Sequence, residues 1–212
     1  MQSKFLKIFS IYLGFLCACM VAAHQSVAQQ AQKLPPWKEG QLDIYQISTG
    51  MGNASFCILP DGTTLLIEAG AINEEYARAI LPIPHPNADH SPAVWISRFI
   101  QAVMPPVSKK QIDFALLTHF HDDHMGAPNS KTPNSTQGNY KLTGISEVGE
   151  MIQIRKVIDR GWPDYIYPSP LNSAMVDNYR RFLNWQIKNN GLVVEKFQTG
   201  RNDQITLMHQ SK

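Results

Sequence analysis

Apolar runs separated by turn residues follow one another in the chain after residue 40. Three of these runs, residues 41–48, 53–59 and 63–69, predict β-strands. The dipeptide Asp61-Gly62 separates the second run from the third and is typical of a tight hairpin. The second and third strands are therefore predicted to form a β-hairpin.

Further along, apolar residues recur at helical spacing, which predicts helices that bury one face. Ser91 and Pro92 are typical of a helix start, and Gly191 is typical of a helix end. Helices are predicted from Pro92 and over residues 144–152 and 172–190, and strands over residues 112–118, 155–159, 192–197 and 204–209. The last two strands are expected to pair antiparallel. This order of elements predicts an α/β fold with helices packed outside a β-sheet.

The first 28 residues have the pattern of a secretory signal peptide. Lys4 and Lys7 precede an apolar stretch, and Ser26-Val27-Ala28 offers small residues for cleavage. We therefore expect an exported protein, periplasmic or secreted, with a disordered tether over residues 29–40 and no transmembrane segment in the mature chain. A lipoprotein anchored through Cys19 and a retained anchor helix are the alternatives.

Removal of this leader changes the charge and the cysteine content. The mature chain would keep 17 basic and 17 acidic residues, so it contains no cluster of Lys and Arg dense enough to indicate nucleic-acid binding. Cys57 would be the only cysteine left and lies in an apolar run, so we expect a buried structural thiol without a disulfide. Composition gives no indication of the oligomeric state.

The densest group of chemically active side chains follows the apolar run at residues 112–117. His119, His121, Asp123 and His124 lie within six consecutive positions there. His119 and His121 point the same way if the backbone is extended, and the chain must turn before Gly126. Imidazole and carboxylate ligands suit zinc, and also iron or manganese. A solvated polar loop is the alternative interpretation.

This His-x-His-x-Asp-His motif resembles the signature of the metallo-β-lactamase-fold hydrolases. The opening hairpin region, residues 42–70, is similar to that of the metallo-β-lactamase-like domain of ComEC-type competence proteins and their secreted relatives. The resemblance implies an αββα sandwich with two zinc ions at one edge. It also implies that His119 and His121 hold the first ion, and that Asp123 and His124 hold the second. Asp123 would in addition orient the nucleophilic water.

Two further residues near the motif are expected to support its ligands. The third strand of the family commonly ends in Asp-x-Gly, and here the acid is Glu68, which either supports a ligand or faces water. Thr118 directly precedes the motif and is expected beside the ligands. In the later loop, Trp162 and Tyr165 either line the site or cover the sheet edge.

The chain departs from the family in its second half. His209 is the only histidine after His124, and it is a candidate third ligand only because it follows an apolar run. No later Asp and His pair completes the site. We therefore expect the chain, residues 41–212, to be the N-terminal part of a longer metallo-β-lactamase-like domain.

Two classes of function fit these observations. The first is an exported metal-dependent hydrolase that acts on a small molecule or a phosphodiester, with metal-activated water attacking an ester, amide or phosphodiester bond. The second is a non-catalytic exported binding protein, or an inactive fragment, that retains half of the metal site.

Overall fold

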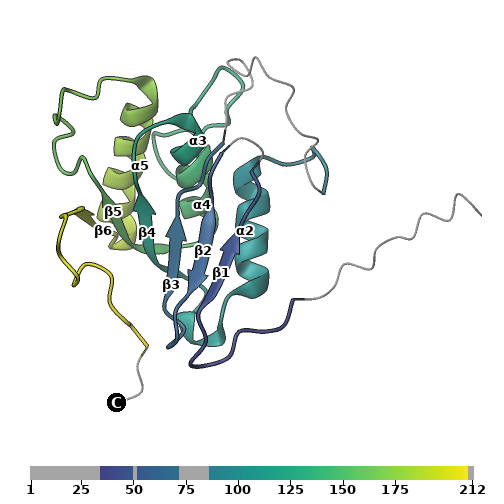
Figure 1. Cartoon of the computed structure of the whole chain (residues 1–212). Coiled ribbons are helices and arrows are strands. Elements are labelled where there is room, and N and C mark those ends of the chain that lie inside the picture. Colours follow the sequence, from purple (N-terminus) through teal and green to yellow (C-terminus); the bar gives the residue numbers. More distant parts are fainter. Residues whose placement is uncertain (1–33, 50–51, 72–85, 210–212) are drawn as a thin grey trace, which may run out of the picture. The chain divides into compact units, whose positions relative to one another are not determined.

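One six-stranded sheet organises the described part of the chain, with its strands side by side in chain order (Figure 1). The computed structural model describes residues 34–49, 52–71 and 86–209. The chain separates into two units, Met1–Pro35 and Pro36–Lys212, and every helix and strand described lies in the second. The strands are β1 (Asp43–Gln46), β2 (Ser55–Ile58), β3 (Thr64–Ile67), β4 (Ile112–Leu117), β5 (Ile154–Asp159) and β6 (Val193–Lys196).

The direction of the strands changes at β3. The pairs β1–β2 and β2–β3 are antiparallel, whereas β4, β5 and β6 continue parallel to β3. The predicted hairpin at Asp61-Gly62 is confirmed: the Gly62 amide donates to the Leu59 carbonyl at 2.8 Å, and Gly62 has φ +86°. An L-residue with a side chain adopts that backbone conformation rarely, which explains the glycine.

Helices connect the parallel strands, as the helical spacing predicted. They are α2 (Pro92–Val103), α3 (Asp122–Met125), α4 (Gly144–Met151) and α5 (Ala174–Asn190), with a 3₁₀ turn η1 at Pro106–Ser108. The Ser91 side chain accepts a hydrogen bond from the Val94 amide and caps α2, and Gly191 ends α5 with φ +68°. Both boundary predictions are confirmed.

The core lies between the sheet and the three longer helices. Helix α4 contacts both α2 and α5, so these helices cover one face side by side (Figure 1). Strand residues of that face and apolar helix residues form one buried cluster, which includes Leu66, Ala115, Leu117, Val157, Ile96, Ile100, Ile145, Val148, Phe182 and Leu183. Burial of these side chains is the main source of stability, at about 1.5–3 kcal/mol for each large one.

Two expectations about the second half of the fold were not met. Residues 204–209 form no strand, and β6 pairs parallel with β5 instead of antiparallel with a later strand. The Gln204 side chain explains the difference, because it accepts from the Gln198 amide and donates to the Lys196 carbonyl. These side-chain bonds replace a backbone ladder. The described residues also form one sheet rather than two stacked sheets.

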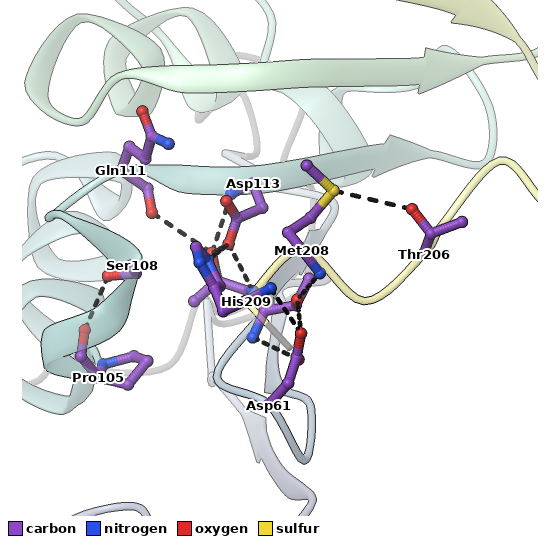
Figure 2. Close-up of polar contacts among 10 residues, drawn as sticks. Asp61, Pro105, Ser108, Gln111, Asp113, Thr206, Met208 and His209 are labelled. Atoms are coloured by element: carbon purple, nitrogen blue, oxygen red, sulfur yellow. Dashed lines mark hydrogen bonds and ion pairs between the residues drawn. The ribbon is translucent and has the colours of Figure 1, made fainter. Parts of the chain in front are cut away.

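The segment after β6 returns along the face of the sheet opposite the helices. Val157 faces the core, so the adjacent Lys156 points to the opposite face of the sheet. There, Lys156 donates from Nζ to the Gln204 carbonyl at 3.1 Å. The Met208 amide donates to the Thr63 hydroxyl at 2.7 Å, and the His209 amide donates to Asp61 at 2.8 Å (Figure 2). The end of the described chain is thus fastened to the β2–β3 hairpin.

The predicted leader, residues 1–28 with Cys19, lies outside the described residues, as does the first part of the predicted tether. Residues 34–40 contain no helix or strand, and Trp37 packs against the core. Among the described residues, no helix is both long enough and apolar enough to span a membrane. Cys57 is buried and free, as expected, and burial raises its pKa.

Candidate metal centre

The histidine motif lies where β4 ends, next to the end of β3. These two strands are parallel neighbours, so the residues that follow them emerge at the same edge of the sheet. Glu68 follows β3. The residues Thr118 to His124 follow β4, and the last three of them belong to the short helix α3. The fold therefore brings together two segments that lie 50 residues apart in the sequence.

The three imidazole rings of the motif lie close together. The centroid of the His119 ring is 4.7 Å from that of His121 and 3.7 Å from that of His124. His119 and His124 are partly buried, whereas His121 is exposed. The expectation that these side chains face a common region is met.

Glu68 reaches this group from β3. Its side chain is buried and its backbone has φ +65°, a left-handed conformation that costs a residue with a Cβ about 1–2 kcal/mol. The Thr118 hydroxyl donates to Glu68 Oε1, and it also lies 3.0 Å from Nδ1 of His119. Strained backbone of this kind is typical of functional sites.

His124 meets Glu68 on its other side. Nδ1 of His124 lies 2.5 Å from Oε2 of Glu68, yet this buried nitrogen makes no hydrogen bond of suitable geometry with the described residues. Nε2 of the same ring lies 3.3 Å from the Asp123 carboxylate. A buried ring nitrogen without a hydrogen-bond partner is costly unless another group, such as a metal ion, satisfies it.

The surroundings of His119 favour its neutral form. Burial lowers its pKa, the charges of His124 and His121 lower it further, and Glu68 and Asp123 act in the opposite direction. The neutral imidazole is the form that donates a lone pair to a metal ion. His119 is therefore prepared to act as a ligand at neutral pH.

Backbone hydrogen bonds fasten α3 to the first hairpin. The carbonyl of Asp123 accepts from the Asn53 amide at 2.7 Å, and the carbonyl of His124 accepts from the Ala69 amide at 2.9 Å. The Asp122 carbonyl accepts from the Ala71 amide at 3.1 Å. These bonds fix the direction of the ligand side chains and satisfy carbonyls that a short helix leaves without partners.

Gly70 allows this close approach, because a Cβ at this position would lie 1.9 Å from the Asp123 carbonyl oxygen. We expect Gly70→Ala to displace α3, to lower the free energy of unfolding by about 1–3 kcal/mol and to weaken metal binding. Thermal unfolding and metal titration would measure both effects. Gly200→Ala is the control for metal binding: a Cβ there meets nothing within 4 Å, so the metal affinity should not change, although φ +86° makes alanine strained at this position too. Equal metal affinity in both variants would contradict the prediction.

A second buried polar cluster supports the motif from β5. Asp159 is fully buried and accepts from the Gly161 and Trp162 amides, each at 2.8 Å, and from the hydroxyls of Tyr165 and Tyr179 at 2.8 and 2.9 Å. Burial, together with the Asp159 charge, raises the pKa of both tyrosines, so they remain donors.

This cluster bears on the motif through Phe120. The Phe120 ring packs 5.5 Å from Tyr165 and 6.0 Å from Tyr179, measured between centroids. Because Phe120 stands between His119 and His121, its packing helps to place both histidines. Tyr165 is buried and Trp162 partly buried against the core, so of the two open interpretations the structure favours packing at the sheet edge.

The structure places His209 away from the motif. Its Nε2 lies 3.0 Å from the carboxylate of Asp113, the second residue of β4, whereas the motif follows the last residue of that strand (Figure 2). His209 is therefore not brought to the other histidines.

Within the described residues, the atoms that could bind a metal form two overlapping groups. One is Glu68, His119 and His124, and the other is His119, His121 and Asp123, with the ligand atoms of each group within 4.8 Å of one another. Nitrogen and carboxylate oxygen ligands in threes suit zinc or iron. The sequence predicted four of these five residues as ligands, and it predicted Glu68 only as a supporting residue. Neither a family model nor a curated protein matches this sequence.

Proposed function

We propose that this chain is an exported metal-dependent hydrolase, related to the metallo-β-lactamase fold, with its centre at the His-x-His-x-Asp-His motif. The observation that carries the proposal is the convergence of Glu68, His119, His121, Asp123 and His124 at one edge of the sheet. Clustered imidazoles repel one another when protonated, and burial adds to that cost. An arrangement of this kind is favoured when a cation is bound.

The residues present fit a divalent ion. The buried Nδ1 of His124, which makes no hydrogen bond of suitable geometry among the described residues, and the lowered pKa of His119 both favour a bound cation over a bound proton. A bound zinc ion would supply Lewis acidity and a water with a pKa near 7. Zinc is the ion we propose, and two ions are expected by resemblance; iron and manganese are the alternatives.

Asp123 is the residue we assign to proton transfer. Its carboxylate is partly exposed, with 38% of the side chain accessible, and lies beside the partly buried His124 ring. In that position it can orient a water molecule and accept its proton while the water attacks an ester, amide or phosphodiester bond. The buried Glu68 is less suited to this task, because its oxygens are engaged by Thr118 and His124.

The proposal is tested by metal analysis and hydrolysis assays on the purified chain. We expect bound zinc and zinc-dependent cleavage within a panel of a phosphodiester, an ester, a lactam and a thioester. Asp123→Asn leaves Glu68, His119 and His124 in place, so it should retain at least one ion and lower turnover by about 100- to 10,000-fold, as the loss of a general base does.

The control is Asp164→Asn, which changes an exposed aspartate of the β5–α5 loop and should leave turnover unchanged. Metal without hydrolysis of any substrate would favour the binding-protein alternative. Absence of metal above background would overturn the proposal.

A further inference from the structure

We infer that Glu68, His119 and His124 together form the primary ion site of this chain, and that His121 and Asp123 border its open side. This inference rests on the proposed function, because it assumes that the cluster binds a metal. It differs from the pairing that the family resemblance implies, which joins His119 with His121 and makes Glu68 at most a supporting residue. The ligand set would be one carboxylate and two imidazoles, with a position left open for water. Such a set is typical of catalytic zinc.

The first argument concerns which nitrogen of His119 is available. The Thr118 hydroxyl has one proton and donates it to Glu68, so toward His119 it can only accept. Nδ1 of His119 therefore carries the proton, and Nε2 has the free lone pair. Thr118 thus acts as a positioning residue that links two ligands of the same ion.

The second argument concerns His124 and Glu68. Their ligand atoms lie 2.5 Å apart, as an ion pair, without a hydrogen bond of suitable geometry, so a single ion that binds between them would contact both after a small separation. Glu68 adopts its strained left-handed backbone in order to place the carboxylate there.

The third argument concerns how many ions His119 can bind and how deeply each group of ligands is buried. His119 belongs to both groups, and with Nδ1 engaged by Thr118 it offers a single nitrogen, so it serves only one ion at a time. The group with Glu68 contains a buried residue and two partly buried ones, whereas the other contains the exposed His121. Electrostatic attraction for a cation is stronger in the more buried group.

The experiment is a Co²⁺ titration of the whole chain, followed by visible absorption and by competition with a chelator. We expect one tight equivalent in the unmodified protein. Glu68→Gln keeps the side-chain size and an acceptor for Thr118, and it should weaken that equivalent by more than about 100-fold, beyond the 10- to 100-fold that loss of a supporting residue costs, and shift its absorption bands. The matched control Glu147→Gln changes a glutamate that bonds Ser91 at the start of α2, and it should leave the titration unchanged.

A second pair of variants keeps the test decisive if Glu68→Gln does not fold. His124→Ala should lose the tight equivalent, whereas His121→Ala should retain it, because only His124 belongs to the proposed site. Circular dichroism would establish that both variants are folded.

The opposite pattern, with His121→Ala losing the ion and His124→Ala and Glu68→Gln retaining it, would overturn this inference and leave the proposed function intact. No binding of Co²⁺ or Zn²⁺ by the unmodified chain would overturn the proposed function as well.

Discussion

Replacement of His119 by alanine should abolish metal binding, with a loss of at least about 100-fold in affinity for Zn²⁺ or Co²⁺. His119 is the one residue common to both groups of ligand atoms, so its removal leaves two ligands in either group. Loss of a supporting residue alone typically weakens metal binding about 10- to 100-fold, and loss of a shared ligand should exceed that. Competition with a chromophoric chelator would measure the change.

The fold should tolerate this substitution. Removal of one imidazole from a cluster of three relieves repulsion between them, so the metal-free variant should unfold near the temperature of the metal-free parent. His90→Ala is the control: His90 is exposed and its ring packs edge-to-face against Trp95, 5.0 Å away between centroids, outside the cluster. Parental affinity in His119→Ala would show that the ion binds elsewhere.

Replacement of Asp159 by alanine should lower the free energy of unfolding by about 3–5 kcal/mol. The substitution removes the acceptor of two backbone amides and two tyrosine hydroxyls, and each buried donor left unpaired costs about 1–3 kcal/mol before the site relaxes. Denaturant titration would give the value. Asp159→Asn retains one acceptor oxygen and should cost less.

Asp164→Ala, an exposed change in the loop after Asp159, should shift stability by no more than about 0.5 kcal/mol. If Asp159→Ala also changed stability by so little, the four hydrogen bonds would not be a stabilising unit. Because Phe120 packs on Tyr165 and Tyr179, we also expect weaker metal binding in the destabilised variant.

Much of the sheet and all three longer helices could be predicted, because local signals specify them. Ser91, Asp61-Gly62 and Gly191 act on their immediate neighbours, and the structure has the expected cap, turn and helix end at each. The proximity of the motif histidines could also be predicted, since alternation along an extended chain places His119 and His121 on the same side.

The remaining features depend on contacts between distant segments. Glu68 meets Thr118 across 50 residues, and that contact requires the parallel register of β3 and β4. Asp159 binds hydroxyls 6 and 20 residues ahead, which no local pattern reveals. Residues 204–209 have an apolar strand pattern, but Gln204 supplies side-chain hydrogen bonds to β6 that a sequence pattern does not anticipate.

The backbone bonds between α3 and the first hairpin have a consequence for protein design. The carbonyls of Asp122, Asp123 and His124 are held by amides from Asn53, Ala69 and Ala71, and Glu68 comes from that same hairpin. A short peptide or a graft that transplants only Leu117 to Gly126 into another scaffold would carry the motif without its supports. A transferable form of this centre would need at least the β2–β3 hairpin, β4 with its following loop, and the aromatic cluster after β5 on which Phe120 packs.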